Sequence, residues 1–267
     1  MRPFLKWAGN KYTCLEILQK HLPKGQRLIE PFMGSAALSL NADFDRYLLA
    51  DINHDLVALY NYLQQEGQKF IDYCARHFTQ NNNTDEVYYS KRDKFNQLKM
   101  SRQRAALFLY LNRHGYNGLC RYNLSGGYNV PFGRYKKPYF PRQEMLHFHE
   151  KSHAIEVHHK DYLSTMDNAK QDDIIYCDPP YIPLSTSASF TAYSRNKFGL
   201  QEQQQLADMA RKKAKQGIPV AISNHDTDFT RQCYQGAELI SFKVARYISC
   251  NANNRTPVKE LLAIFHP

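Results

Sequence analysis

A carboxylate, two prolines and a tyrosine follow a run of strand-forming residues at positions 174–183, which read IIYCDPPYIP. The run ends at Asp178, whose side chain is a strong hydrogen-bond acceptor. Pro179 and Pro180 then lock the backbone, and Tyr181 places an aromatic ring directly beyond them. This order of residue types indicates an acceptor that is held rigidly at the end of a buried strand.

A second candidate site lies at residues 28–41, LIEPFMGSAALSLN. The pattern predicts a strand, a turn at Gly34 and a helix from about residue 35, and ligands of open α/β sheets bind at the carboxyl ends of such strands. Asp51 ends the next predicted strand, where an acid commonly accepts hydrogen bonds from ribose hydroxyls. By themselves, these features are equally compatible with ordinary turn chemistry.

Basic residues are concentrated in one part of the chain. The formal charge is +10, and residues 91–142 hold twelve Lys and Arg residues against a single acid, Asp93. Nine aromatic residues between Phe108 and Phe140 are interleaved with these cations, which favours a nucleic-acid surface with phosphate contacts and stacked bases. The alternative is a solvated basic face over an aromatic core.

Strands and helices are expected to alternate, which predicts an α/β fold with a sheet covered on both faces. Strands are predicted at 27–31, 46–51, 154–159, 173–178, 218–224, 239–249 and 260–266. Besides the helix from about 35, helices are predicted at 54–65, 68–79, 86–98, 102–113 and 200–216. Residues 53–145 interrupt the alternation and are interpreted as an inserted lobe.

Length and composition limit the class of protein. The 267 residues suit one large domain or a domain with an insertion, and no run of 18 apolar residues predicts a membrane span. The N-terminal residues lack the apolar core of a signal peptide, so we expect a soluble, cytoplasmic protein. The six cysteines have no metal-binding spacing, so we expect reduced thiols and no metal site.

Seven segments together carry a family resemblance: FLKWAGNK (4–11), EPFMG (30–34), ADIN (50–53), NRHGYNGLCRYN (112–123), VPFGRYKKPYFP (130–141), DPPY (178–181) and ISNHDT (222–227). Because these segments stand in the order of the family, the chain resembles the Dam-type DNA adenine-N6 methyltransferases, the D12 class of the DPPY amino-methyltransferases. The resemblance implies a Rossmann-like class I methyltransferase sheet in a catalytic domain of residues 1–52 and 146–267. It also implies a target-recognition lobe at 53–145, with a β-hairpin at about 116–135.

The implied reaction transfers a methyl group from S-adenosylmethionine to the N6 amino group of adenine and leaves S-adenosylhomocysteine. The lone pair of this amino nitrogen is delocalised into the ring, so acceptors that hold both amino hydrogens favour the nucleophilic form. The resemblance implies that the Asp178 carboxylate and the Pro179 carbonyl are these acceptors, that Pro180 stiffens the turn and that Tyr181 stacks on the adenine. Stacking requires the target nucleotide to be flipped out of the duplex.

The resemblance also implies the residues that bind the methyl donor. They come from the N-terminal motif, the strand-end motifs and the DPPY turn: Trp7, Lys11, Glu30, Pro31, Phe32, Gly34, Asp51, Asp161, Tyr162 and Asp178. The chain departs from the family pattern at Asn10 and Ala36, where family members usually have glycine.

For duplex DNA, the resemblance implies GATC as the target. Arg121 is expected on guanine, Lys6 and Tyr135 on the outer base pair, and Tyr116 in the place of the flipped adenine. The full set of expected DNA contacts is Lys6, Arg92, Arg113, Tyr116, Asn117, Leu119, Arg121, Asn123, Pro131, Arg134, Tyr135, Lys136 and Lys137. Leu119 and Pro131 are expected against thymine, and Arg92, Arg113, Lys136 and Lys137 on phosphates. We expect a monomer without an obligate protein partner.

Three other functions stay open at this point. The enzyme could belong to the same family but methylate a different DNA sequence. It could be an amino-methyltransferase that acts on RNA or protein, although such enzymes usually have Asn at the position of Asp178. It could also be a catalytically silent DNA-binding protein, which the intact DPPY motif disfavours.

Overall fold

The fold is described from a computed structural model, which places residues 1–181, 198–244 and 258–267. The chain divides into two compact units. The first unit contains residues 1–12, 34–41 and 51–159, and the second contains residues 13–33, 42–50 and 160–267. The predicted division into a catalytic domain and a recognition lobe concerns function and stays a prediction.

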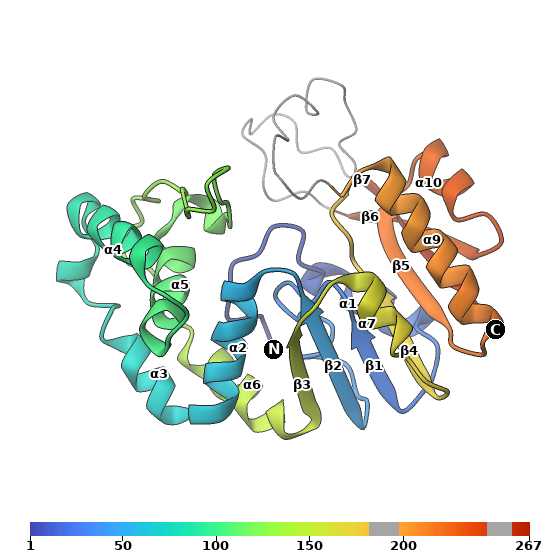
Figure 1. The fold of residues 1–267 in the computed structure, drawn as a ribbon, viewed down its shortest axis with the longest axis horizontal. Helices are drawn as coiled ribbons and strands as arrows, with labels where there is room; N and C mark the ends of the chain where they lie inside the picture. The colour runs from blue at the N-terminus through green and yellow to red at the C-terminus, as the bar shows by residue number, and fades with distance from the viewer. Residues whose placement is uncertain (182–197, 245–257) are drawn as a thin grey trace. The chain divides into compact units, whose positions relative to one another are not determined.

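The strands of the second unit run in the order β2-β1-β4-β5-β7-β6. Their bounds are Arg27–Glu30 (β1), Arg46–Asp51 (β2), Asp173–Cys177 (β4), Val220–His225 (β5), Glu238–Val244 (β6) and Val258–Phe265 (β7). Strands β2, β1, β4 and β5 pair in parallel, whereas β7 is antiparallel to both of its neighbours. The carboxyl ends of β1 and β4 therefore lie at one edge of the sheet (Figure 1). The α/β class and the Rossmann-like sheet are confirmed.

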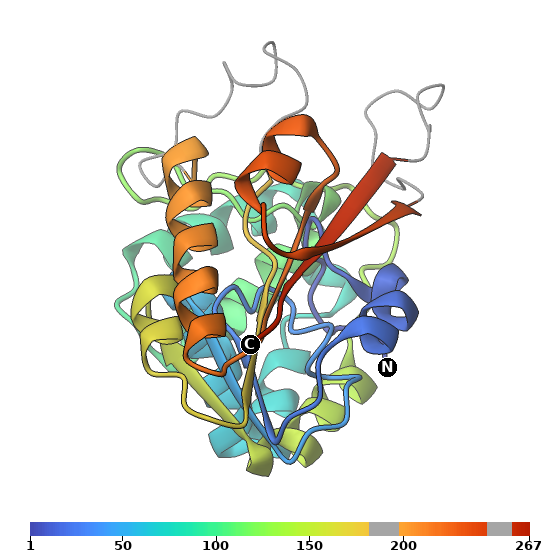
Figure 2. The ribbon, with the colours of Figure 1, turned by 90° about the vertical axis from the view of Figure 1, so that its right-hand side faces the viewer.

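Helices cover both faces of this sheet. The bounds are Leu15–His21 (α1), Tyr162–Asp167 (α7), Leu200–Lys215 (α9) and Asp228–Cys233 (α10). Figure 2 shows α9 on one side of the strands and α1 on the other. The apolar face of α9, with Leu206 and Ala210, packs in one core with Ile222 and Phe265. Helix α9 was predicted, but α1, α7 and α10 are too short for an apolar period to show in the sequence.

The first unit is mainly helical. Its elements are α2 (His54–Glu66), α3 (Gln68–Ala75), α4 (Asp85–Gln97), α5 (Arg102–His114), α6 (Arg142–Lys151) and β3 (Ile155–His159), with single 3-10 turns at Gln80–Asn82, Tyr116–Gly118 and Ser152–Ala154. A further 3-10 turn, Tyr12–Cys14, precedes α1. Helices α2 to α5 were predicted, and α6 was missed. Asn53, Thr84 and Ser101 cap the first turns of α2, α4 and α5 with side-chain oxygens.

Several of the interleaved aromatic residues form the core of the first unit. Phe108, Tyr110 and Tyr128 are fully buried, so their interpretation as a stacking surface is wrong. Tyr128 meets Phe95 at a centroid distance of 5.6 Å in an edge-to-face contact. Only part of the aromatic set faces solvent, and Tyr116 and Tyr139 are its exposed members among the nine.

The helix predicted from residue 35 is wrong. The chain between β1 and β2 forms turns instead of a helix. Gly34 and Ala36 have φ angles of +45° and +51°, in the left-handed region that an α-helix cannot contain. No helix N-terminus therefore follows β1, and the Gly34 N–H donates to Asp51 instead.

The segment predicted as a β-hairpin is paired by two isolated antiparallel bridges, Gly115–Phe132 and Tyr122–Tyr128. Its turn is closed by hydrogen bonds from Asn123 N to Gly127 O at 2.8 Å and from Gly126 N to Asn123 O at 2.9 Å. The predicted strand 239–249 corresponds to β6 up to Val244, and residues 245–249 lie outside the described residues.

Candidate active site

The turn after β4 begins where a fully buried strand ends. All five residues of β4 are buried, whereas Asp178 is partly exposed. Pro179 is buried and Pro180 is exposed, and neither proline has a backbone N–H. The strand thus delivers a carboxylate and two proline carbonyls to its carboxyl end, which is where open α/β sheets bind their ligands.

Tyr181 is held by two strands of the same sheet. Its hydroxyl donates to Glu260 Oε2 at 3.3 Å, and its ring meets the His225 ring at 4.6 Å with an interplanar angle of 69°. His225 of β5 and Glu260 of β7 are register partners, so both contacts come from one end of the β5–β7 pair. Burial, together with the charges of Asp178 and Glu260, raises the pKa of Tyr181 well above its ordinary value, so the hydroxyl stays protonated.

Two acids converge on the end of β4. Burial, and then the charges of Asp178 and Glu30, raise the pKa of Cys177 well above that of a free thiol. Glu30 is the last residue of β1 and is 3% exposed. The carboxyl ends of β1 and β4 therefore bring Glu30 and Asp178 into one electrostatic environment.

An aromatic cluster follows β1. Phe32 stacks on Tyr162 with a centroid distance of 5.2 Å and an interplanar angle of 25°. Phe198 meets both rings at 5.4 Å in edge-to-face contacts. Phe198 was not predicted, because no recognisable motif surrounds it. Asp161 caps α7 by accepting from Ser164 N at 2.9 Å, and this bonding lowers its pKa, so the predicted contact with the methyl donor competes with a capping role.

In the first unit, Trp7, Gly34 and Asp51 lie together. The Gly34 N–H donates to Asp51 Oδ2 at 3.1 Å, and the Asn53 N–H donates to Asp51 Oδ1 at 2.8 Å. A Cβ atom at Gly34 would lie 2.8 Å from Trp7 Nε1, so only glycine lets the indole approach this closely. Burial raises the pKa of Asp51, and the two backbone hydrogen bonds and the charge of His159 oppose that effect.

The N-terminal motif folds into a turn that buries Lys11. The Lys11 ammonium donates to Gly9 O at 2.9 Å, and the Asn10 side chain donates to Trp7 O at 3.0 Å. Gly9 has a φ angle of +76°, whereas Asn10 is not among the described non-glycine residues with positive φ. The first departure from the family pattern is therefore accommodated without backbone strain, and the second, Ala36, is not.

Arg121, the expected guanine contact, is exposed and oriented by a neighbour across the paired segment. Its Nε donates to Asn129 Oδ1 at 2.8 Å, and one Nη donates to Asn129 O at 3.1 Å. A guanidinium has five donors in a planar fork. Two are engaged by Asn129, so the remaining donors at the outer end of the fork suit a bidentate contact with guanine.

Lys6 contacts Asn112 and Tyr135 of the first unit with its backbone and its side chain. Its backbone exchanges two hydrogen bonds with the buried Asn112 side chain, at 2.9 and 2.7 Å. Its ammonium lies 3.7 Å from the centre of the Tyr135 ring, and the Tyr135 hydroxyl accepts from Asn117 N at 2.9 Å. Burial, with a smaller effect of Arg113, lowers the pKa of Lys6 to about 8. Lys6, Tyr135 and Asn117, all expected DNA contacts, therefore lie in one cluster.

The other expected DNA contacts differ in exposure. The exposed ones are Tyr116, Asn117, Asn123, Pro131, Arg134, Lys136 and Lys137, whereas Leu119 and Arg92 are partly buried. Arg113 is largely buried, and its Nε donates to Tyr139 O at 3.0 Å. Arg104, one of the twelve clustered cations, forms a bidentate pair with Asp55 at 2.6 and 3.0 Å. Part of the basic cluster thus stabilises the fold of the first unit.

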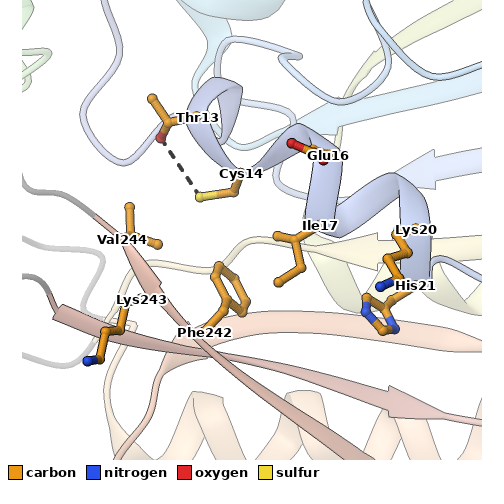
Figure 3. Close-up of a pocket in the computed structure, with 9 residues that line it drawn as sticks. All are labelled: Thr13, Cys14, Glu16, Ile17, Lys20, His21, Phe242, Lys243 and Val244. Atoms are coloured by element: carbon orange, nitrogen blue, oxygen red, sulfur yellow. Dashed lines mark hydrogen bonds between the residues drawn. The ribbon is translucent and has the colours of Figure 1, made fainter.

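A separate cavity lies in the second unit between α1 and β6, with a volume of about 470 Å³ (Figure 3). Its lining combines apolar side chains such as Ile17 and Phe242 with Lys20, His21 and Lys243, and it includes none of the predicted site residues. Within residues 1–181, 198–244 and 258–267 there is no group of His, Cys, Asp or Glu side chains that could hold a metal ion. No helix in these ranges is long and apolar enough to span a membrane.

Comparison with known proteins identifies the family. A model of the D12 class N6 adenine-specific DNA methyltransferases matches residues 7–248. The DNA adenine methylase of Escherichia coli K12 is 51% identical over 266 residues, which cover all of this chain and 96% of that protein. The DNA adenine methylase of Vibrio cholerae O1 (strain ATCC 39541) is 53% identical over 267 residues, with the same coverage.

Similarity to solved structures is low in comparison. The rRNA methyltransferase AviRa of Streptomyces viridochromogenes is similar with a TM-score of 0.40 and 10% identity, over 95% of this chain and 83% of that one. The full-length relatives and the family model are decisive. The chain belongs to the D12 class of N6 adenine-specific DNA methyltransferases and is an enzyme that methylates adenine in DNA.

Proposed function

We propose that this enzyme transfers the methyl group of S-adenosylmethionine to adenine N6 at GATC sites in duplex DNA, on a target nucleotide that is flipped out of the helix. The observation that carries the proposal is the turn of Asp178 to Tyr181, which the end of β4 presents with its tyrosine already bonded to Glu260. The alternative is another DNA target sequence within the same family.

Several side chains have the chemistry that the methyl donor requires. Asp51 ends β2 with a carboxylate whose oxygens can accept further hydrogen bonds, as ribose hydroxyls require. The stacked rings of Phe32 and Tyr162 offer an aromatic surface for a planar base. Trp7 and Lys11 are also proposed to bind the methyl donor. When bound, S-adenosylmethionine supplies an electrophilic methyl group on a positively charged sulfur, and the acids Glu30 and Asp178 suit a cationic ligand.

The turn holds the acceptor. An Asp178 oxygen and the Pro179 carbonyl each accept one hydrogen of the adenine amino group, which localises the nitrogen lone pair toward the methyl group. As the N–C bond forms, the bond between the methyl group and the donor sulfur breaks, and the amino group passes one of its two protons through the Asp178 oxygen to solvent. Pro180 keeps the carbonyl groups in place. Tyr181, fixed by Glu260 and His225, stacks on the flipped base.

Target recognition is assigned to the first unit. Arg121 contacts guanine through the guanidinium end that Asn129 leaves available, and Lys6 with Tyr135 contacts the outer base pair. Leu119 and Pro131 lie against thymine, Tyr116 fills the place of the adenine, and Asn117 contacts the strand beside it. Asn123, Arg134 and the expected phosphate contacts Arg92, Lys136 and Lys137 position the duplex, and the enzyme acts as a monomer.

The test uses the full chain with labelled methyl donor and plasmid DNA. Treated DNA is digested with paired restriction enzymes that both cleave GATC but differ in their sensitivity to N6-methyladenine. We expect label in the DNA and protection from the methylation-sensitive enzyme alone. Label in the DNA without protection would exclude GATC and support the alternative target sequence. No transfer from S-adenosylmethionine would exclude the proposed donor.

A further inference from the structure

A buried glutamine on α9 contacts the turn that follows β4. Gln203 is the fourth residue of the helix and is fully buried. Its side-chain Nε2 donates to the carbonyl of Pro180 at 3.0 Å. Pro180 lies between Pro179, whose carbonyl is a proposed acceptor for the adenine amino group, and Tyr181, which is proposed to stack on the base.

Gln203 is in turn held by two buried side chains. Its Oε1 accepts from Asn224 Nδ2 at 3.0 Å and from the Tyr234 hydroxyl at 3.0 Å. Asn224 Nδ2 also donates to the Tyr234 hydroxyl at 2.8 Å. Asn224 and Tyr234 are both 0% exposed. The three side chains thus form a closed triangle of hydrogen bonds without solvent contact.

The backbone at both ends of this network permits one orientation of the two amides. The Pro180 carbonyl can only accept, so Gln203 must present its NH₂ group to it. Asn224 must then present its NH₂ group to Gln203 Oε1, which leaves Asn224 Oδ1 for the His225 N–H, a group that can only donate, at 2.8 Å. A fully satisfied buried network of this kind is rigid.

The two prolines leave the turn with fewer donors of its own. Turns usually hold themselves with backbone N–H groups, and two consecutive prolines remove two of these donors. At Pro180, the carbonyl instead accepts a hydrogen bond from Gln203 of the neighbouring helix α9. Tyr181 is held independently by Glu260 and His225, so the two contacts fix the turn at successive residues.

We propose that Gln203 is a positioning residue for methyl transfer, which fixes the Pro179–Tyr181 backbone through Pro180, and that Asn224 and Tyr234 fix the amide of Gln203. This inference rests on the proposed role of the turn. It predicts that loss of the Gln203 donor lowers kcat and leaves substrate binding largely unchanged, because a shift of about 1 Å in a reacting group can lower a rate by about 10²-fold.

The decisive variant is Gln203→Glu, which keeps the acceptor for Asn224 and Tyr234 but has no donor for Pro180 when ionised. At pH 8 we expect the single-turnover rate constant of methyl transfer, and kcat where this step limits turnover, to fall by about 10- to 50-fold. The Kd values for duplex DNA and S-adenosylmethionine should stay within about twofold of the wild type. Burial raises the pKa of a carboxyl group, so the protonated glutamic acid regains an O–H donor as the pH falls toward 6. The ratio of variant to wild-type kcat should therefore rise at lower pH.

Two further variants keep the test independent of folding. Gln203→Met has no donor at any pH and should show the loss without the recovery. Lys213→Met is the matched control, because Lys213 lies on the same helix, is 3% exposed and donates to Asp167 O at 2.9 Å. We expect Lys213→Met to lower Tm and leave kcat unchanged. If Gln203→Glu does not fold, Tyr234→Phe, which keeps the bond to Pro180, should lower kcat by about two- to fivefold.

Wild-type kcat in folded Gln203→Glu, or the same pH profile for Gln203→Glu and Gln203→Met, would overturn the positioning role. A loss of kcat in Lys213→Met equal to that in the Gln203 variants would also overturn it, because any lost buried bond would then have this effect. Failure of the proposed function is separate, since the wild-type enzyme would then transfer no methyl group from S-adenosylmethionine to DNA.

Discussion

In the turn of Asp178 to Tyr181, polar groups are bonded to side chains of neighbouring elements, whereas in residues 116–135, which we call the reading segment, many polar side chains face solvent. Pro180 O is bonded to the fully buried Gln203, and the Tyr181 hydroxyl to Glu260. Arg121 and Arg134 of the reading segment are exposed. A catalytic group benefits from a fixed position before the substrate arrives, but a group that reads bases must keep donors that the protein does not use.

The reading segment nevertheless has a fixed base. The Tyr122 hydroxyl donates to Asp55 Oδ2 at 2.7 Å, and Asp55 is paired with Arg104. Tyr128 is buried and donates to Leu119 O at 3.0 Å. The aromatic residues on one side of the segment thus hold its backbone, while the polar residues between them stay exposed. Mutations in the two regions should therefore differ in which kinetic constant they change.

The largest effect is expected in the turn. Asp178→Ala removes an acceptor that is used mainly in the transition state, so kcat should fall by roughly 10²- to 10³-fold while duplex affinity stays within about twofold. Single-turnover methylation and fluorescence anisotropy with duplex DNA measure the two quantities. Asp167→Ala, which changes an exposed acid of the same unit, is the control. Near-normal turnover in Asp178→Ala would remove the carboxylate from the amino-holding role.

Asp51 provides a test of binding of the methyl donor. Asp51→Ala leaves ribose hydroxyls without their acceptor and also frees the Gly34 N–H, so S-adenosylmethionine affinity should fall by roughly 1–3 kcal/mol. Calorimetric titration of the folded variant measures the affinity. Asp161→Ala should have a smaller effect, because Asp161 is exposed and caps α7. Unchanged affinity in Asp51→Ala would place the ribose partner elsewhere.

In the reading segment, we expect a loss of discrimination. Arg121→Ala should lose roughly ten- to hundred-fold of the preference for GATC over duplexes changed at one base pair, since a bidentate arginine–guanine contact contributes about 1–3 kcal/mol. Lys137→Ala is the matched control: as a phosphate contact, it should weaken all duplexes alike and reduce the salt slope by about one. Initial rates on cognate and near-cognate duplexes at two salt concentrations separate the two cases. Full discrimination by Arg121→Ala would mean that this segment does not read the sequence.

The sequence was most informative about elements whose residue pattern is local. The strand before Asp178, the long helix α9 and the sheet class could be predicted, because apolar runs and periods are local properties. The helix after Gly34 could not be excluded, because the left-handed φ of Ala36 is set by the surrounding fold and alanine is otherwise a good helix former.

The candidate site was predictable only in part for a similar reason. Asp51, Gly34 and Tyr181 could be named from motifs, but Glu260 and His225 are brought to Tyr181 by β5–β7 pairing. Charge clustering also does not show which cations are used inside the fold. Arg104 pairs with buried Asp55, whereas Lys137 is exposed. The motifs therefore indicate the candidate groups but not the contacts of Tyr181 with Glu260 and His225.

Backbone strain offers a smaller test in the motif that joins Gly34 and Asp51. Ala36 and Ala37 are both buried, but only Ala36 has a positive φ, +51°. Replacement of either alanine by glycine removes one buried methyl group and adds the same freedom to the unfolded chain. The difference in unfolding free energy between the two variants thus measures the cost of the left-handed backbone at Ala36. We expect Ala36→Gly to be more stable than Ala37→Gly by about 1–2 kcal/mol. Urea unfolding measures it, and equal stabilities would show that Ala36 is not strained.

The smallest effect that we expect is a pH dependence confined to the reading side. The pKa of Lys6 is lowered to about 8 by burial and Arg113, whereas Tyr181 of the turn stays protonated well above pH 10. The Lys6 ammonium therefore loses its proton as the pH rises from 7 to 9, and with it the donor that we propose for the outer base pair.

We expect the preference for the correct outer base pair, measured as a ratio of kcat/KM values, to fall about two- to fivefold over this range, because kcat/KM reports the ionisation of the free enzyme. Lys6→Arg should abolish the pH dependence, since guanidinium stays charged, and Lys6→Met should show the pH 9 preference at pH 7. Stability and base-pair preference are expected to change in opposite directions as the pH rises. Because the pKa of Lys6 is lower in the folded state, the unfolded chain binds more protons above pH 8, so the contribution of Lys6 to stability rises with pH. A preference that stays constant from pH 7 to 9 in the wild type would mean that the Lys6 ammonium does not read the outer pair.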